Sequence, residues 1–376
     1  MNFALTEEQE FLQEAARGTL SRVKTVEAAR EAIPGESGEL PDLWPAAVEA
    51  GWPGLLISEA NEGAGLEPLD AMLVFEELGK VLASVPLLGH LPATFVLDRA
   101  GAEAGLLAEL AAGSRRAAFV PARPPTDLDD RWTTEPARGI ERPVALTVSA
   151  EGTLTGTVAW VPDAPGAATF VVVAVDGSGV PKAVVVDAAS ASVEEVVRYD
   201  ATRSLGHVTF DGATGTVLDA DVSVLANAWY LAQTLIAAEA LGATERALEV
   251  SVQYAKERFT FGRAIGSYQA MKHQLVEVLR LHGNAKSLLY YAGWAGSDMP
   301  SEFPLAASAF RLKAGKALEE SSRIQISVHG GIGATFEHDA PLYFRKAQLS
   351  RRLLGGTAGA ADRVANELFD AARAAA

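Results

Sequence analysis

The feature that most constrains the fold is a break between two long amphipathic segments, at residues 258–273. Arg258 ends the first segment, and the dipeptides Phe261-Gly262 and Ile265-Gly266 follow it closely. Glycine lets the backbone turn tightly, so we expect a helix, a short turn and a second helix that Gln269 opens. The amino end of a helix favours an anion, and a guanidinium beside it is suited to a pyrophosphate. The pattern predicts an anion site at the junction of two helices.

Apolar periodicity divides the chain into three substructures, which we place at residues 1–116, 117–222 and 223–376. The first and third show apolar residues at helical spacing, whereas the second carries short β-branched runs between turn residues. The chain is therefore expected to have an α+β fold, with a helical bundle at its C-terminal end. The expected strands lie at Ala118–Val120, Val144–Val148, Leu154–Val161, Thr169–Val175, Ala183–Val186, Val193–Val197 and His207–Phe210.

Several local signals refine this division. Thr6 with Gln9 predicts a capping box at the start of a helix. Residues 69–82 show a helical pattern in which Gly79 has a mild cost. The Asp176-Gly177 and Asp211-Gly212 pairs predict turns between strands, and residues 124–138 are interpreted as a long irregular loop.

The composition excludes several classes of function. The formal net charge of -16 disfavours a nucleic-acid partner, because binding to phosphates needs a basic face. The chain has no cysteine, which excludes disulfides and thiolate catalysis, and its six histidines lack the spacing of a metal site. No secretory signal and no stretch long enough to span a bilayer is visible. We therefore expect no metal, no membrane span and a cytoplasmic location.

A second glycine-rich block follows the third helical pattern of the C-terminal part. Gly330, Gly331 and Gly333 come directly after His329. These glycines permit close approach of the backbone to a ligand. Taken alone, such a block is more typical of a simple helix C-cap.

The two blocks carry a resemblance to a known family. Residues 258–273 resemble the R-x-x-F-G-x-x-I-G-x-x-Q-x-x-K-H signature of the acyl-CoA dehydrogenase family, and residues 328–338 resemble its Q-x-H-G-G-x-G-x-T-x-E segment. The likeness covers nearly the whole chain and is strongest at residues 239–356. It implies an N-terminal helical domain, a central β-barrel or sandwich domain and a C-terminal four-helix bundle. It also implies FAD as cofactor and an acyl-CoA as substrate.

The resemblance further implies which residues meet the flavin. Members of the family place FAD between the β-domain of one subunit and the bundle of another. The break and the glycine loop would therefore serve the flavin of a neighbouring subunit. The cofactor-binding residues implied in this way are Arg258, Phe261, Gln269, Gly330, Gly331, Thr357 and Trp160.

The chain departs from the family where the chemistry takes place. The two positions that usually carry the catalytic carboxylate correspond to Gly355 and Ala232, and neither residue is an acid. Pro162 replaces a threonine expected to face the flavin, and proline offers no donor. The family's glutamine in the glycine block aligns with Ser327, and its E-P-x-x-G-S-D loop is absent. Residues for the chain's own flavin are thus eroded, whereas those for a partner's flavin are largely kept.

This asymmetry is similar to that of the base-less chain in heterotetrameric (α2β2) members of the family from actinobacteria. In such pairs one chain carries the base and the other completes the FAD site. The resemblance therefore implies a homologous partner subunit, with electron-transfer flavoprotein as the acceptor.

Two alternatives remain open at this point. One is a homo-oligomeric dehydrogenase whose base has moved to Glu239, where an apolar surrounding would raise the carboxyl pKa. Glu239 lies two turns, about 10 Å, beyond Ala232, and it is otherwise expected to pair with Arg246 or to face solvent. The other is a non-catalytic scaffold homologue.

Overall fold

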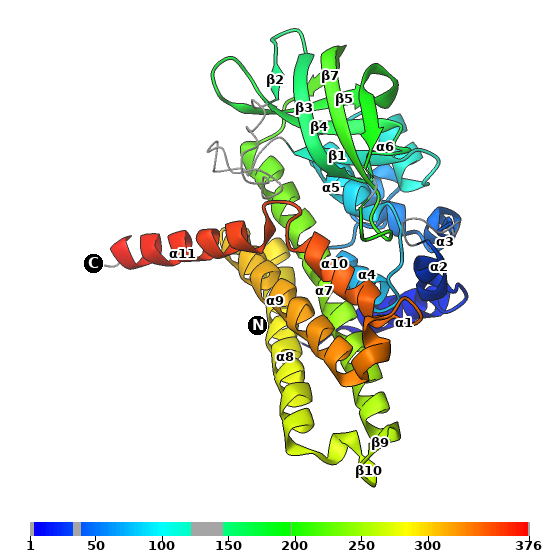
Figure 1. Ribbon diagram of the computed structural model, residues 1–376. Coiled ribbons are helices and arrows are strands. Elements are labelled where there is room, and N and C mark those ends of the chain that lie inside the picture. The colour runs from blue at the N-terminus through cyan, green and yellow to red at the C-terminus, as the bar shows by residue number, and fades with distance from the viewer. Residues whose placement is uncertain (1–3, 33–38, 122–145, 197, 375–376) are drawn as a thin grey trace.

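The computed structural model describes residues 4–32, 39–121, 146–196 and 198–374. Its sheet lies at the upper end in Figure 1, and most of the helices lie below it. The predicted capping box is confirmed, since the Gln9 amide donates to the Thr6 hydroxyl and the Gln9 side chain accepts from the Thr6 amide. The predicted loop at residues 124–138 lies outside the described residues. Ahead of the sheet lie α1 (Glu7–Leu20), α2 (Thr25–Glu31), α3 (Trp44–Glu49), α4 (Pro68–Lys80), α5 (Leu87–Arg99) and α6 (Ala104–Ala111).

The central sheet is curled and has the strand order β6-β7-β3-β2-β4-β5-β8, with β1 added in parallel to β4. Its inner side buries a core of valine, leucine and phenylalanine side chains, including an edge-to-face pair between Phe170 and Phe210 at 6.2 Å. The strands are β1 (Ala117–Pro121), β2 (Thr147–Val148), β3 (Thr153–Pro162), β4 (Thr169–Val175), β5 (Pro181–Asp187), β6 (Ser192–Glu195), β7 (Leu205–Thr214) and β8 (Thr216–Leu218).

The two predicted strand turns have different outcomes. The turn at Asp176 is confirmed, because the Asp176 amide donates to the Val180 carbonyl at 3.0 Å between β4 and β5. The turn at Asp211-Gly212 is wrong, because both residues lie inside β7. Gly212 has a φ of 72° at a shift in register against β3, so the pair forms a bulge and not a turn.

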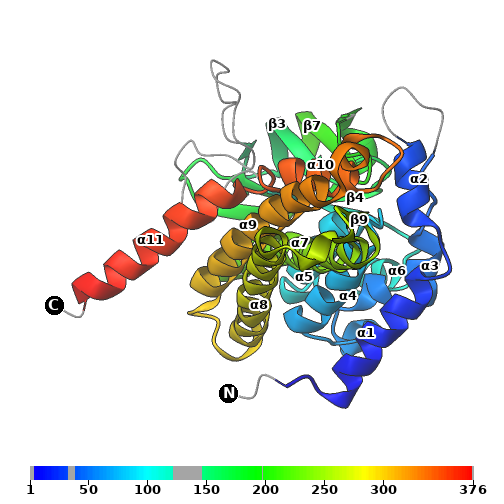
Figure 2. The same cartoon turned by 60° about the horizontal axis from the view of Figure 1, so that its bottom comes forward.

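The C-terminal part is helical, as expected. Three long helices, α7 (Val222–Glu257), α8 (Gln269–Asp298) and α9 (Phe303–His329), pack on one another. They are followed by α10 (Ala340–Ser350) and α11 (Gly356–Ala374). Helix α7 lies at the centre of this part. It packs against α4 and α5 from the N-terminal part and against α8, α9 and α10. In Figure 2, α11 extends away from the other helices.

Two glycines allow α4 and α7 to cross at backbone contact. A Cβ atom added at Gly79 on α4 would lie 1.9 Å from the Glu239 carbonyl oxygen, and one at Gly242 on α7 would lie 1.8 Å from the Glu76 carbonyl oxygen. Real Cβ atoms do not approach an oxygen so closely. Gly79, expected only to weaken its helix, is therefore required by packing.

A cluster of buried charges joins the β-part to the helices. Arg203, in the segment before β7, pairs with Glu239 on α7, and Lys346 on α10 donates to the same carboxylate at 2.9 Å. Asp200 lies 3.9 Å from the Lys346 ammonium, and Asp163, at the end of β3, accepts from the Gly89 amide at 2.8 Å. All of these charged side chains are buried, so they hold each other in place away from water.

The glycine crossing predicts a large cost for one methyl group. We expect Gly242→Ala to lower the free energy of unfolding by about 3 kcal/mol, because the new Cβ must push two helix backbones apart. The matched control is Gly18→Ala in α1, where nothing lies within 4 Å of the added atom. That change should raise stability by about 0.5–1 kcal/mol. Chemical denaturation of both variants checks the prediction, and equal effects would contradict it.

The Asp163 carboxyl predicts a pH dependence of stability. Burial raises its pKa to about 6, although Arg203 and the Gly89 amide act in the opposite direction. The native state therefore holds this proton more tightly than the unfolded chain, and stability falls as pH rises from about 4 to about 6. Asp163→Asn should gain on the wild type by roughly 2 kcal/mol across that range, measured by denaturation at each pH. A difference that stays constant with pH would show that Asp163 is already ionised at pH 4.

Candidate functional site

The predicted break after α7 is a β-hairpin at the far end of the helical part. Arg258 is the first residue beyond α7 and has an extended backbone. Strand β9 (Phe259–Thr260) then pairs with β10 (Arg263–Ala264). The two residues between them, Phe261 and Gly262, both have positive φ, of 53° and 78°, which is typical of a tight hairpin turn. Phe261 is 93% exposed, so the turn presents an aromatic ring to solvent.

The chain returns from this hairpin to α8 in the way that the glycine pattern predicted. The Ile265 amide donates to the Arg258 carbonyl at 2.8 Å. A Cβ at Gly266 would lie 2.8 Å from the Ala255 carbonyl oxygen, so this position must be glycine for the turn to pack on α7. Gln269 is the first residue of α8, as expected, and both Arg258 and Gln269 are exposed.

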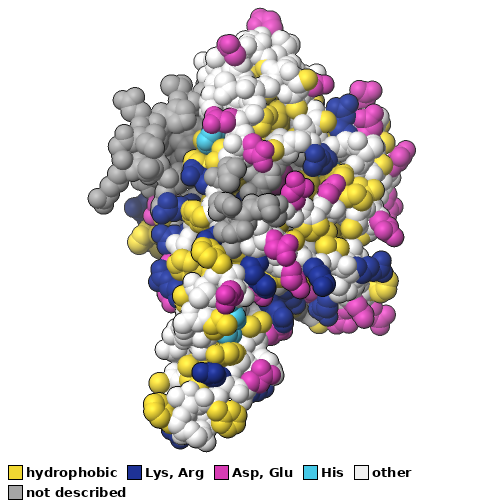
Figure 3. Space-filling view, turned by 45° about the vertical axis from the view of Figure 1, so that its right-hand side comes forward, with side chains coloured by type: hydrophobic (Ala, Val, Ile, Leu, Met, Phe, Trp, Pro, Cys, Tyr) yellow, Lys and Arg dark blue, Asp and Glu magenta, His cyan; other side chains and the backbone are white. Residues whose placement is uncertain are grey.

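The glycine-rich block follows a residue that contacts the last turns of α7, just before the hairpin. Helix α9 ends at His329, whose ring lies 4.3 Å from that of Tyr254, one turn before the end of α7. Gly330 has a φ of 65°, and a Cβ on Gly330 or Gly331 would meet nothing within 4 Å. Both motifs therefore lie near the same end of α7. We call Arg258, Phe261, Gln269, Gly330 and Gly331 the hairpin tip. Figure 3 shows hydrophobic side chains exposed at this lower end of the molecule.

The glutamine near the glycine block does not face the hairpin tip. Gln325 is fully buried, and neither of its side-chain polar atoms has a partner among the described residues. Ser327, which occupies the position of the family's glutamine, is exposed. An exposed serine therefore stands at the position of the family's glutamine, whereas the nearby Gln325 is buried.

Both positions that lack the usual base lie at the other end of α7. Ala232 is 1% exposed, and its neighbour Gln233 donates to the Leu354 carbonyl at 2.9 Å. Gly355 follows directly and has a φ of 81°. A Cβ on Gly355 would lie 3.3 Å from the Trp229 ring and 3.7 Å from the Gln233 side-chain nitrogen. The structure thus brings the two positions together, and neither of them carries a carboxylate.

Thr357 and Trp160 do not belong to the hairpin tip. Thr357 begins α11 just after Gly355 and lies against Gly315 on α9. Trp160 is half-buried on β3. The centre of its ring lies 4.6 Å from that of the His207 ring and 3.7 Å from the guanidinium carbon of Arg198. Both residues therefore lie outside the region that the two motifs form.

The length of α7 separates these two groups of residues. The helix is continuous over 36 residues, and the 26 residues from Ala232 to Arg258 span about 39 Å at the α-helical rise. Figure 1 shows the hairpin at the end of α7 opposite to the sheet. Within one chain, the hairpin tip and the base positions are too far apart to hold the same flavin.

Glu239 is not the isolated carboxyl that a relocated base requires. Burial alone would raise its pKa, but the charges of Arg203 and Lys346 and their hydrogen bonds outweigh that effect and lower it. The expectation of a raised pKa is therefore wrong, because the surrounding of Glu239 is ionic and not apolar. The expected pairing with Arg246 is also wrong, since Arg246 pairs with Glu249 at 3.2 Å.

Sequence reasoning missed the partners of Glu239. Arg203 precedes it by 36 residues and Lys346 follows it by 107. The only local signal was a glutamate inside an apolar run, and that signal could have indicated a buried ion pair as well as a catalytic acid.

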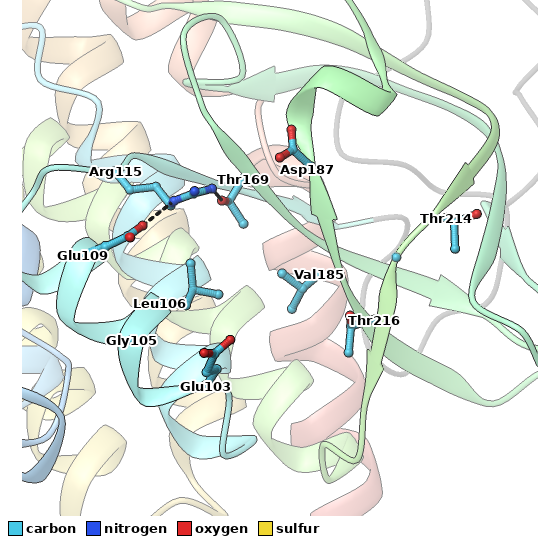
Figure 4. A pocket seen from close by; sticks show the side chains of 11 residues that line it. Glu103, Gly105, Leu106, Glu109, Arg115, Thr169, Val185, Asp187, Thr214 and Thr216 are labelled. Carbon is cyan, nitrogen blue, oxygen red and sulfur yellow. Dashed lines mark hydrogen bonds and ion pairs between the residues drawn. The ribbon is translucent and has the colours of Figure 1, made fainter.

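A groove between α6 and the sheet holds none of the predicted site residues (Figure 4). It has a volume of about 540 Å³. Arg115 lies at one end, where it donates to Glu109 at 2.8 Å and to the Thr169 hydroxyl at 3.1 Å. Its guanidinium is thus already engaged, and the groove offers no free cation to an anionic ligand.

One three-residue group has the composition of a metal site. Glu76, Glu245 and His282 lie close enough for one ion, within the part of the chain that the structure describes. Lys286 already pairs with Glu76 at 2.6 Å and Lys80 with Glu245 at 3.1 Å, so the group is an ion-pair network between helices. No helix among residues with a described position combines the length and the apolarity needed to cross a membrane.

Comparison with known proteins identifies the family of the chain. A family model described as the C-terminal domain of acyl-CoA dehydrogenase matches residues 224–369, and one described as the N-terminal domain matches residues 6–105. Acyl-CoA dehydrogenase IpdE2 of Mycolicibacterium smegmatis is 31% identical over 97% of this chain and 100% of the relative.

Two solved structures have the same fold. A variant of the Tcur3481-Tcur3483 steroid ACAD is 28% identical, with a TM-score of 0.84 over 98% of this chain and 99% of its own. The ChsE4-ChsE5 complex from Mycobacterium tuberculosis is 26% identical, with the same TM-score and coverage. The chain therefore belongs to the acyl-CoA dehydrogenase family, whose members are FAD-dependent oxidoreductases that act on CH–CH bonds.

Proposed function

We propose that this chain is the base-less subunit of a hetero-oligomeric acyl-CoA dehydrogenase, and that it completes the FAD site of a homologous partner subunit. One observation carries the proposal. The exposed hairpin tip keeps the family signature, whereas Ala232 and Gly355, about 39 Å away along α7, lack a carboxylate. A chain that served its own flavin would need a carboxylate at Ala232 or Gly355 more than it would need the hairpin tip.

The chemistry of the hairpin tip fits the pyrophosphate of FAD. The exposed Arg258 offers a guanidinium that can donate to phosphate oxygens, and Gln269 opens a helix of 30 residues whose amino end favours an anion. Gly330 and Gly331 have no neighbour within 4 Å of an added Cβ, so their backbone is open to a ligand. When bound, FAD accepts the hydride that leaves the β-carbon of the acyl-CoA.

The remaining step, removal of the α-proton, requires a carboxylate within reach of the α-carbon. This chain provides none at either usual position, so the base is assigned to the partner subunit. Two related structures support a two-chain assembly, since they contain the pairs named Tcur3481-Tcur3483 and ChsE4-ChsE5. Electron-transfer flavoprotein is the proposed acceptor of the electrons.

Arg258 in the hairpin tip and Trp160 on β3 make opposite predictions for flavin binding. In the complex with the partner subunit, Arg258→Gln should weaken FAD binding by roughly tenfold or more, because a charge-assisted hydrogen bond is lost. The matched variant Trp160→Phe should change FAD binding by less than about twofold. Both are measured by titrating apo-complex with FAD. Loss of FAD from the Trp160 variant alone would show that this chain uses its own flavin site.

Substitution of Glu239 separates this proposal from a relocated base. Glu239→Gln should leave the turnover of the complex within about threefold, whereas removal of a general base costs roughly 10²–10⁴-fold. The same change should lower the free energy of unfolding by about 3 kcal/mol, because Arg203 and Lys346 lose their shared carboxylate. Acyl-CoA turnover and denaturation are measured on the same preparation. A collapse of turnover with unchanged stability would assign catalysis to Glu239.

A further inference from the structure

Two imidazole rings join the two ends of the glycine loop, the segment Gly330–Ala334. His329 ends α9 directly before the loop, and His338 lies between the loop and α10. The ring centres are 4.2 Å apart, and the ring planes form an angle of 45°. The loop is therefore closed at its base by contact between the two histidines.

His329 is fixed in place by its own helix and by α7. It is 4% exposed, and its ring centre lies 4.3 Å from that of Tyr254. Its Nδ1 atom donates to the Gln325 carbonyl at 2.7 Å, because a carbonyl oxygen can only accept. His329 thus connects the end of α9 to the last turns of α7, which lead to the hairpin tip.

The glycine loop packs directly on His329. A Cβ atom added at Gly333 would lie 2.8 Å from the Cβ atom of His329 and 2.6 Å from the Ile326 carbonyl oxygen. A Cβ atom added at Gly330 or Gly331, in contrast, would meet nothing within 4 Å. A displacement of His329 must therefore move the part of the loop whose backbone is open to a ligand.

His338 makes a hydrogen bond that exists only while its ring is uncharged. The Ala340 amide, at the start of α10, donates to the His338 Nδ1 atom at 3.0 Å. Because a backbone amide can only donate, Nδ1 must carry a lone pair, and the proton of the neutral ring lies on Nε2. A charged imidazole ring has a donor at both nitrogens. Protonation of His338 therefore breaks this bond and turns two N–H groups toward each other.

The surroundings of His338 also favour the uncharged ring. Burial lowers its pKa most, and His329 and Arg30 lower it further, whereas Asp339 acts in the opposite direction. Arg30, on α2, pairs with Asp339, which weakens the attraction of that carboxylate for a proton on His338. Tyr254 faces the pair from α7 with an aromatic ring and adds no acid. The closed arrangement is therefore stable at neutral pH, and it loses stability as the pH falls below about 6.5.

We propose that His338 is a positioning residue for FAD: its uncharged ring holds His329, and through His329 the glycine loop, in the geometry that binds the flavin nucleotide. The inference rests on the proposed function, which assigns FAD to the hairpin tip. A proton taken up by His338 breaks the bond with the Ala340 amide and disturbs the contact with His329. The arrangement that binds FAD excludes this proton, so FAD affinity falls at acid pH.

The first test measures the FAD affinity of the complex with the partner subunit at about pH 7.5 and about pH 5. The wild type should bind FAD roughly threefold to tenfold more weakly at the lower pH. His338→Phe keeps a ring beside His329, and His338→Asn keeps an acceptor for the Ala340 amide. Neither side chain takes up a proton, so the affinity of both variants should change by less than about twofold.

The matched control is His207→Phe, which removes a half-buried histidine on β7 that lies against Trp160. This variant should keep the pH dependence of the wild type. The same pH dependence in both His338 variants as in the wild type would overturn the proposal. Tighter binding of FAD by the wild type at acid pH would also overturn it, because a charged His338 would then be attracting the phosphates directly.

The second test needs neither the partner subunit nor FAD. Hydrogen exchange of the full chain alone, corrected for the intrinsic effect of pH, should show the Ala340 amide losing about threefold or more of its protection between about pH 7.5 and about pH 5. His338→Asn should keep that protection. Unchanged protection in the wild type would overturn the role of His338. A complex that holds no FAD at either pH would instead reject the proposed function.

Discussion

The structure depends on the unbroken length of α7. Thirty-six residues form one helix, about 54 Å long, which is buried on every side over residues 228–244. Its contact with α4 is close enough that Gly79 and Gly242 cannot carry a side chain without moving the backbone. A helix held in this way cannot bend to bring its ends together. The residues around Ala232 and those around Arg258 must therefore act on different ligands or on different subunits.

This constraint bears on Ala232 and Gly355, the two positions at which the family resemblance implies a catalytic carboxylate. In the proposed scheme a self-sufficient dehydrogenase needs both ends of α7, one for its own flavin and one for its neighbour's. Here the outer end keeps an exposed arginine and an open glycine loop, while Gly355 and Ala232 hold no acid. The buried charges around Glu239 do not restore the function, because Arg203 and Lys346 hold that carboxylate as a structural anion. This is the arrangement expected of the base-less subunit that we propose.

Sequence patterns predicted the features whose causes are local. The break after Arg258 follows from closely spaced glycines, and it formed where expected. The turn predicted at Asp211-Gly212 was wrong because the same dipeptide suits a bulge as well as a turn. Only the pairing of β7 with β3 distinguishes the two. Helix α5 was not predicted, since it is apolar on all sides and shows no stripe. The ion pairs of Glu239 were out of reach, because Arg203 and Lys346 approach it only through packing.

The most direct test of the account is the flavin content and mass of the purified chain, alone and co-expressed with its homologue. The account predicts a colourless chain that turns yellow only in the complex, with one FAD for each unlike pair. This chain would then bind flavin through Arg258 and the Gly330 loop on behalf of its partner. A yellow homo-oligomer that forms alone and is reduced by an acyl-CoA would contradict the account.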